Sequence, residues 1–243
     1  MKKCVKVLIG ITGVLAISSL VGLVITGWQI GWGPFRILFK GYGDEVAAIE
    51  KKYDVNTRKG EIVFYGASNF RMWTDMEEDL APYPVQNHGF GGSTDKMLVE
   101  FADRILYPYE PKVVFFQTGS NDYVVIPGTD EEKISACMEY KKYMFETFHK
   151  MLPNAKFVVM SGLLLPGRSE YASLTQKINQ ELKSYCAEKD YMYFVDASEM
   201  TYDGKDYRKE LFISDGIHLN HDGQLLWAKN YILPKLNELS NLK

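Results

Sequence analysis

Apolar, strand-like runs recur along most of the chain, and longer segments with apolar residues at helical spacing separate them. The five runs are Ile62–Tyr65, Val85–Asn87, Val113–Gln117, Phe157–Ser161 and Tyr193–Asp196. Strands that alternate with helices form parallel βαβ units, whose sheet is covered by helices on both faces. The pattern therefore predicts an α/β domain with three layers, α/β/α, around a five-stranded parallel sheet.

The segments between these runs carry helix signals. Thr129 and Glu132 form a capping-box pattern, and Pro153 ends the helix that follows. Apolar residues three or four positions apart mark the expected buried faces of this helix and of two later ones: Ile134, Met138, Phe145, Phe148 and Leu152; Leu174, Ile178, Leu182 and Tyr185; Leu225, Leu226, Ile232, Leu233 and Leu236. We expect these side chains to pack in the core.

The amino-terminal segment differs from the rest of the chain. Three lysines precede the uncharged run Val7–Ile30, which as a helix is long enough to cross a bilayer core of about 30 Å. We expect an uncleaved transmembrane helix. The alternative is a signal peptide cleaved near Ala16-Ile17-Ser18, but cleavage there would leave the apolar stretch Leu20–Ile25 on the mature protein.

Three parts of the chain follow from this pattern. Residues 1–32 are the membrane anchor or signal peptide, residues 33–58 are a stalk, and residues 59–243 are one globular domain. We expect the domain to be membrane-anchored and extracytoplasmic, although Arg36 and Lys40 reduce the charge asymmetry that sets orientation. Secretion after signal cleavage is the alternative.

Composition narrows the classes of partner. The formal charge is −3 and basic residues are mixed with acidic ones, which argues against nucleic acid as a partner. Cys4, Cys137 and Cys186 have no metal-ligand spacing. Cys137 and Cys186 lie on apolar helix faces, so we expect buried free thiols, with a disulfide as the alternative.

The turn Gly89–Gly92 lacks a nucleotide-binding spacing, and we predict neither a metal nor a cofactor. The oligomeric state stays unknown.

Small polar residues follow three of the predicted strands. Ser68 comes after the first strand, the Gly89–Gly92 turn after the second, and Asn121 after the third. Ligands of open α/β sheets bind beyond the carboxyl ends of the strands, so we expect these residues to meet in one crevice. Backbone N–H groups of the turn and the Asn121 carboxamide are donors suited to an oxyanion. Each residue is also common as a helix cap or turn residue, and none alone indicates a catalytic site.

Asp215 and His218 lie three residues apart, shortly before the last predicted helix. A serine hydroxyl is a poor nucleophile until a base accepts its proton, and a histidine serves best when a carboxylate fixes its tautomer. This spacing could let Asp215 reach Nδ1 of His218 while Nε2 points at Ser68. The other three histidines of the chain lack such an arrangement.

Taken in order, four motifs resemble those of the SGNH hydrolases, also called the GDSL esterase/lipase family. The motifs are Phe64 to Ser68, Asn87 to Thr94, Gly119 to Asp122 and Leu211 to Asn220. The likeness covers about Glu61 to Leu236 and is closest to a bacterial branch with Phe-Tyr-Gly-x-Ser and Asp-Gly-x-His-Leu-Asn motifs. The resemblance implies a flavodoxin-like sheet.

The resemblance also implies roles for single residues. Ser68 would be the nucleophile, His218 the general base and then the general acid, and Asp215 the residue that orients His218. The Ser68 N–H, the Gly92 N–H and the Asn121 side chain would form the oxyanion hole, with Gly91 as a near alternative to Gly92. Ala67 departs from the family pattern, in which an aspartate precedes the serine.

The expected function is therefore that of a serine esterase. It would hydrolyse short-chain acyl esters, O-acetyl esters above all, through an acyl-enzyme, on a small molecule or on envelope carbohydrate. A lipase or thioesterase, or an O-acyltransferase of the same fold, is one alternative. A non-catalytic carbohydrate-binding protein that has kept the fold is another.

Overall fold

The computed structural model describes residues 41–241. The span predicted over Val7–Ile30 lies outside the described residues and stays a prediction. Within residues 41–241, no helix combines the length and the apolar character that a bilayer crossing requires.

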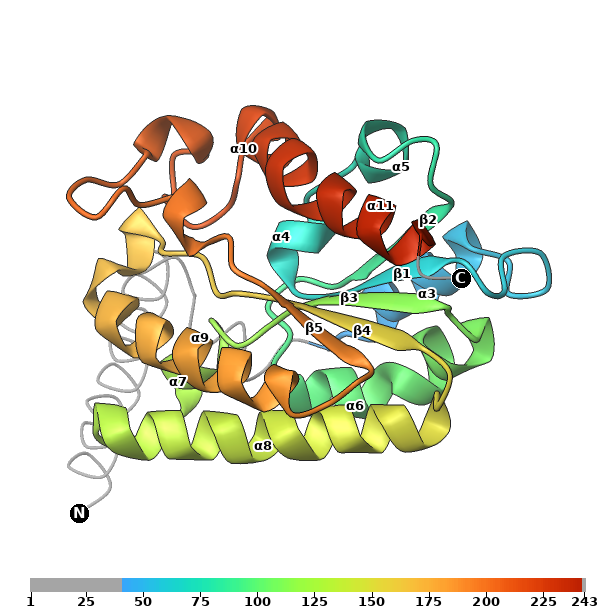
Figure 1. Ribbon diagram of the computed structural model, residues 1–243, viewed down its shortest axis with the longest axis horizontal. Coiled ribbons are helices and arrows are strands. Elements are labelled where there is room, and N and C mark those ends of the chain that lie inside the picture. The colour runs from blue at the N-terminus through green and yellow to red at the C-terminus, as the bar shows by residue number, and fades with distance from the viewer. Residues whose placement is uncertain (1–40, 242–243) are drawn as a thin grey trace, which may run out of the picture. The chain divides into compact units, whose positions relative to one another are not determined.

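Five parallel strands form one sheet (Figure 1). They are β1 (Ile62–Gly66), β2 (Val85–Gly89), β3 (Val113–Gln117), β4 (Lys156–Met160) and β5 (Met192–Val195). Their order is β2-β1-β3-β4-β5, the order of the flavodoxin-like doubly wound fold. The predicted fold class and its five strands are confirmed for this part of the chain.

Helices cover both faces of the sheet (Figure 1). One layer holds α3 (Gly43–Lys52), α6 (Asp95–Ile105), α8 (Asp130–Met151) and α9 (Ala172–Ala187). The other holds α4 (Ser68–Arg71), α5 (Met76–Asp79), α10 (His221–Trp227) and α11 (Leu233–Asn241). The short helix α7 (Asp122–Val125) follows β3, and short 3-10 helices connect several of the longer elements.

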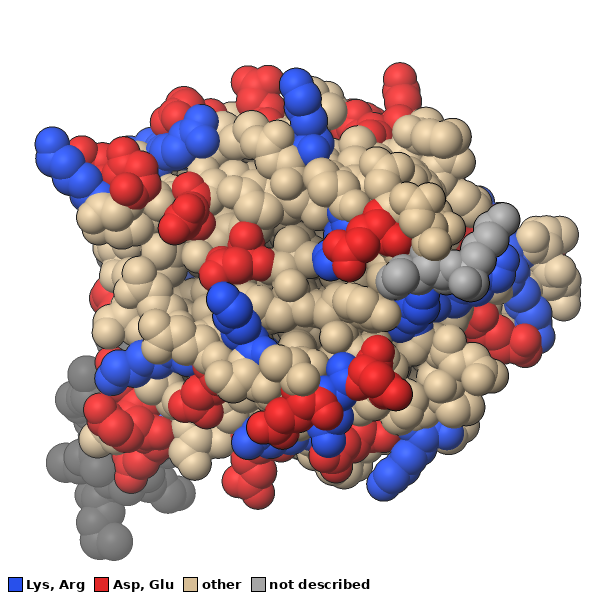
Figure 2. Space-filling view, in the orientation of Figure 1, with Lys and Arg blue, Asp and Glu red and all other residues tan. Residues whose placement is uncertain are grey.

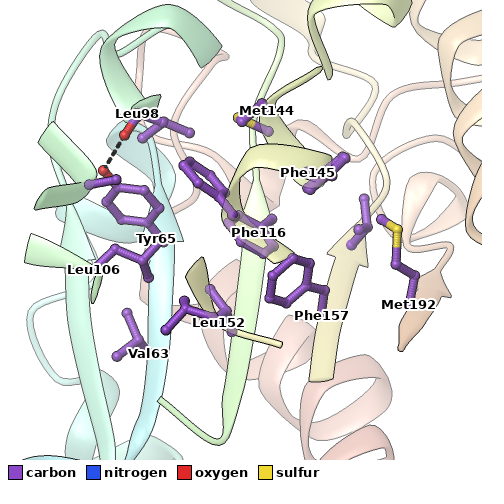
Figure 3. Packing of buried hydrophobic residues seen from close by; sticks show 14 of the residues in the cluster. Val63, Tyr65, Leu98, Leu106, Phe116, Met144, Phe145, Leu152, Phe157 and Met192 are labelled. Carbon is purple, nitrogen blue, oxygen red and sulfur yellow. Dashed lines mark hydrogen bonds between the residues drawn. The ribbon is translucent and has the colours of Figure 1, made fainter. Parts of the chain in front are cut away.

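Successive strand residues face opposite helix layers. Tyr65 and Phe116 belong to the core under α6 and α8, where the Tyr65 hydroxyl donates to the Leu98 carbonyl oxygen over 2.6 Å (Figure 3). Phe64 and Phe115 belong to the core under α4 and α10, and their rings stack with centroids 4.6 Å apart. This alternation fixes the register of the central strands, because a slip by one residue would exchange the two cores.

Helix α3 belongs to the segment predicted as a stalk, residues 33–58, of which the structure describes residues 41–58. The helix packs on the domain through Val46 and Ile49, which are buried. The charged residues of α3 are the reason for the stalk prediction. Two apolar residues three positions apart are nevertheless enough to pack one face of a short helix on the domain.

The structure tests the local predictions for the start of α8, the two cysteines and the last helix. The capping box of Thr129 and Glu132 is present at the start of α8, and Cys137 and Cys186 are buried free thiols. The prediction for Leu225 is wrong, because its side chain is 39% exposed. A π-helical turn at Ala228–Ile232 interrupts the last helix, and the helical spacing assumed across it does not hold.

Candidate active site

Ser68 is the first residue of α4 and directly follows the turn at the end of β1. Asn87 of β2 holds this short helix, since its Nδ2 donates to the carbonyl oxygens of Phe70 (2.6 Å) and Trp73 (3.1 Å). Gly89 lets β2 lie close to α4, because a Cβ atom at this position would lie 2.5 Å from the backbone nitrogen of Arg71. The Ser68 side chain is therefore presented from a fixed loop at the carboxyl end of the sheet.

The structure brings Ser68, His218 and Asp215 into one hydrogen-bonded chain. Nε2 of His218 lies 2.8 Å from Oγ of Ser68, and Nδ1 of His218 lies 2.6 Å from Oδ2 of Asp215. Ser68 and His218 are half-buried, and Asp215 is more exposed. The three side chains have the order and separations that let a serine hydroxyl pass its proton to an imidazole held by a carboxylate.

Asp215 is anchored by the backbone of its own loop. Its Oδ1 accepts hydrogen bonds from the N–H groups of Ile217 (2.8 Å) and His218 (3.0 Å). Partial burial acts to raise the pKa of Asp215, but the hydrogen bonds from the His218 side chain and from the two N–H groups outweigh it and lower the pKa below its usual value. Asp215 is therefore ionised over the physiological pH range, as a partner of His218 must be.

The Asn121 side chain contacts the segment that contains the Gly-rich turn. Gly92 has a φ of 81°, which favours glycine, and no described residue accepts a hydrogen bond from its N–H. The Gly91 N–H, in contrast, donates to Oε2 of Glu45 over 2.6 Å. Asn121 is buried, and its Nδ2 donates to the Ser93 carbonyl oxygen over 2.9 Å. One Nδ2 hydrogen of Asn121 is left for a ligand, because a carboxamide has two.

A buried charged network lies beneath these two loops. Nζ of Lys141, on α8, lies 2.8 Å from Oδ2 of Asp95 and 2.6 Å from Oγ1 of Thr118. The Asp95 N–H donates to Oδ1 of Asp122 over 3.0 Å. Asp95 follows the Gly-rich turn and Asp122 follows Asn121, so the network ties together the backbones that carry the two candidate oxyanion donors.

The Asp122 carboxyl and the Lys141 ammonium titrate abnormally inside this network. Burial and the nearby charge of Asp95 raise the pKa of Asp122 well above its usual value, against the opposing effect of Lys141. Burial acts to lower the pKa of Lys141, but the charges of Asp95 and Asp122 outweigh it and raise the pKa. Lys141 is therefore a buried cation whose direct ion-pair partner is Asp95.

Two residues at the site were missed by the sequence analysis. Oδ1 of Asn69 accepts the N–H of Leu219 over 3.1 Å and so joins the loop of Ser68 to the loop of His218. Arg168, in the 3-10 helix η2 (Pro166–Tyr171) after β4, donates to Oδ1 of Asn121 over 3.2 and 3.3 Å. The sequence signal for Arg168 is its position in the loop after the predicted strand Phe157–Ser161, since ligands bind beyond the carboxyl ends of strands.

The surface carries charges of both signs (Figure 2). Lys and Arg are interspersed with Asp and Glu on the face shown in Figure 2. Among residues 41–241, no three His, Cys, Asp or Glu side chains are grouped so that they could hold a metal ion.

The family of the chain follows from a comparison of its sequence with family models. The model of the GDSL-like lipase/acylhydrolase family matches residues 41–226. The chain therefore belongs to this family of ester-hydrolysing enzymes, and the resemblance to the SGNH hydrolases is confirmed. No curated protein matches the sequence.

Solved structures share the fold at low sequence identity. A proposed platelet activating factor from Streptococcus pneumoniae has a TM-score of 0.64 at 18% identity, covering 86% of this chain and 95% of its own. A proposed acylhydrolase from Bacteroides fragilis has a TM-score of 0.63 at 19% identity, covering 84% and 97%. A family 3 carbohydrate esterase from Clostridium thermocellum has a TM-score of 0.53 at 19% identity, covering 74% and 99%. At such identities the likeness shows the fold alone.

Proposed function

We propose that the chain is a serine esterase that hydrolyses acyl esters through a covalent acyl-enzyme on Ser68. The observation that carries this proposal is the continuous hydrogen-bonded chain from Oγ of Ser68 through His218 to the Asp215 carboxylate, with separations of 2.8 and 2.6 Å. Family membership supports it, because the GDSL-like lipase/acylhydrolase family acts on ester bonds.

The first half of the reaction forms the acyl-enzyme. Oγ of Ser68 attacks the ester carbonyl carbon while Nε2 of His218 takes the hydroxyl proton, and Asp215 holds Nδ1–H and stabilises the imidazolium. The tetrahedral intermediate then collapses, the bond to the alcohol breaks, and Nε2 returns the proton to the leaving alkoxide oxygen. In the second half, water gives a proton to Nε2 and attacks the acyl carbon. The bond from this carbon to Oγ of Ser68 then breaks, Nε2 returns the proton to Oγ, and the acid leaves.

Three donors stabilise the oxyanion in this proposal: the N–H of Ser68, the N–H of Gly92 and Nδ2 of Asn121. We prefer Gly92 to Gly91 because the Gly91 N–H donates to Glu45. Donors fixed before the reaction stabilise developing charge without reorganisation, and the bond from Asn121 to Ser93 supplies such fixation.

The acyl group that we propose is short, with acetyl as the main candidate. Among the described residues, the large hydrophobic side chains that are exposed are Tyr143, Met151, Ile213 and Leu225. Of these, Ile213 belongs to the loop of His218, while the others lie on α8 and α10. So small an exposed apolar surface favours a short acyl chain over a lipid chain.

The alcohol part that we propose is a carbohydrate of the cell envelope. Two considerations support this: the shared fold with a carbohydrate esterase, and the membrane helix that the sequence predicts over Val7–Ile30, which would hold the domain outside the cytoplasm. Labelling of intact cells with a membrane-impermeant fluorophosphonate tests the location, since only an outward-facing site would react.

Hydrolysis of p-nitrophenyl esters tests the activity. We expect the wild-type protein to release p-nitrophenol from the acetyl ester and Ser68→Ala to lose this activity while keeping its fold. Ser184→Ala, which removes an exposed hydroxyl on α9 that bonds only within its own helix, is the matched control and should behave as the wild type. Unchanged hydrolysis by Ser68→Ala would contradict the proposal.

Two further assays define the substrate. A series from acetyl to dodecanoyl esters should show the highest kcat/KM at the acetyl end, and a preference for long chains would favour a lipase or thioesterase. Incubation with an O-acetylated oligosaccharide should release acetate. Transfer of acetyl to an added acceptor saccharide, in place of release, would indicate an acyltransferase.

A further inference from the structure

Arg168 makes three hydrogen bonds to the segment that carries Asn121. Its Nη1 donates to the Ser120 carbonyl oxygen over 2.6 Å and to Oδ1 of Asn121 over 3.3 Å, and its Nη2 donates to the same Oδ1 over 3.2 Å. Both nitrogens of the guanidinium fork therefore converge on one carboxamide oxygen. A fork of this kind defines the orientation of its acceptor better than a single donor does.

The opposite end of the Asn121 carboxamide is fixed as well. Nδ2 donates to the Ser93 carbonyl oxygen over 2.9 Å. The amide torsion of an asparagine is broad and close to two-fold, so a rotated amide would present Oδ1, an acceptor, where an oxyanion needs a donor. Arg168 opposes that rotation, because its donors require the oxygen to stay on their side.

Arg168 bonds uncharged oxygens within residues 41–241. Its acceptors there are the Ser120 carbonyl oxygen and Oδ1 of Asn121, and no described carboxylate forms a salt bridge with it. Burial lowers the pKa of its guanidinium, against the opposing effects of Tyr123, Tyr171, Glu170 and Asp215. A cation bound to Oδ1 polarises the carboxamide and strengthens the Nδ2–H donor at its other end.

The position of Arg168 is fixed by its neighbour in η2. The Gly167 N–H donates to the Gly216 carbonyl oxygen over 2.8 Å, and a Cβ atom at Gly167 would lie 2.3 Å from the Asp215 carbonyl oxygen. The segment before α9 thus packs directly on the loop of Asp215 and His218. The short helix η2 therefore contacts both the loop of His218, the proposed base, and the loop of Asn121, a proposed oxyanion donor.

We propose that Arg168 is a positioning residue that acts through Asn121: it holds Oδ1 and polarises the carboxamide, so that Nδ2 donates to the oxyanion of the ester. This inference rests on the proposed function. It assigns a role to the segment after β4, which carries none of the residues that the sequence analysis placed in the site. Because Arg168 acts on the reaction through the Asn121 side chain, replacing Arg168 should have no effect on kcat once Asn121 is replaced by alanine.

A double-mutant cycle tests this dependence. The wild-type protein, Arg168→Gln, Asn121→Ala and the double variant are compared in kcat and KM for p-nitrophenyl acetate, with the rate of Ser68→Ala subtracted. One oxyanion donor contributes about a hundredfold or more to kcat, so we expect that loss for Asn121→Ala and about a tenfold loss for Arg168→Gln, with KM unchanged within about twofold. The double variant should be no slower than Asn121→Ala within about twofold.

Two results would overturn the inference. If the two losses multiply in the double variant, Arg168 does not act through Asn121. If Arg168→Gln raises KM and leaves kcat unchanged, Arg168 binds the substrate instead. Arg104→Gln is the matched control, because Arg104 of α6 pairs with Glu50 of α3 and with none of the residues proposed for the site, and it should leave both constants unchanged.

Folding of the variants is monitored by thermal unfolding. If Arg168→Gln fails to fold, Arg168→Lys is used in the same cycle, since it keeps the charge but loses the fork, and the same expectations and refuting results apply. The two proposals fail separately. Activity retained by Ser68→Ala would overturn the proposed function, whereas an inactive Ser68→Ala with multiplying losses would overturn only the role of Arg168.

Discussion

Replacing Lys141 by methionine should strongly destabilise the domain. The side chains of Lys141 and Asp95 are 1% and 0% exposed, with Nζ 2.8 Å from Oδ2. Methionine fills most of the space of the lysine stem but leaves Asp95 buried without its counter-charge. Oδ1 of Asp95 already has no hydrogen-bond partner among the described residues, so the carboxylate has little compensation left.

The expected magnitude follows from this burial. Breaking a buried ion pair by removing one partner costs about 3 to 5 kcal/mol of unfolding free energy. For a domain of this size each kcal/mol lowers Tm by about 2 to 4 °C, so Lys141→Met should lower Tm by about 6 to 20 °C. Urea unfolding followed by circular dichroism measures the free energy directly.

Two further variants make this stability measurement specific to the ion pair. Lys142→Met changes the neighbouring exposed lysine on α8 and should alter the unfolding free energy by less than about 0.5 kcal/mol. Asp95→Asn in the Lys141→Met background removes the unpaired charge and should recover part of the loss. A loss below about 1 kcal/mol for Lys141→Met, or no recovery by Asp95→Asn, would refute the assignment of the cost to an uncompensated buried carboxylate.

Two other predictions concern Asp215 and Asp122. Asp215→Asn should reduce kcat by about 10⁴-fold, because an amide that donates to Nδ1 of His218 leaves the proton on Nε2. Steady-state kinetics measure this loss, with the exposed Asp222→Asn as the control. A loss of less than tenfold would contradict the prediction. Burial and Asp95 raise the pKa of Asp122, so the stability that its protonated form contributes is lost as pH rises from about 3.9 towards the raised value. Urea unfolding at several pH values should therefore show Asp122→Asn gaining stability over the wild type as pH rises through this window, and parallel curves would count against it.

Much of the fold could be predicted from sequence because its signals are local. Four of the five strands are short, mostly apolar runs, β2 (Val85–Gly89) being the exception, and the capping box at the start of α8 is a four-residue pattern. The packing of α3 through Val46 and Ile49 and the exposure of Leu225 could not be predicted in this way. Both depend on tertiary contacts: which helix face meets the sheet, and where a π-helical turn changes the helical spacing.

The candidate site shows the same division. Ser68, Asn121, Asp215 and His218 lie next to recognisable strand ends or in family motifs, and the structure joins Ser68, His218 and Asp215 by hydrogen bonds. Arg168 lies in no such motif, and its partner Asn121 is 47 positions away in sequence. Contacts of this kind depend on how two loops from different strands approach each other, which residue patterns within one segment do not encode.

Labelling with a fluorophosphonate tests the central claim most directly, because the probe reacts with an activated serine whatever the natural substrate is. We predict that intact-protein mass spectrometry of the wild type and of Ser184→Ala shows one covalent adduct, which maps to the peptide containing Ser68. Ser68→Ala should show none. A folded wild-type protein that takes up no probe, or equal labelling of Ser68→Ala, would contradict the claim that Ser68 is an activated nucleophile.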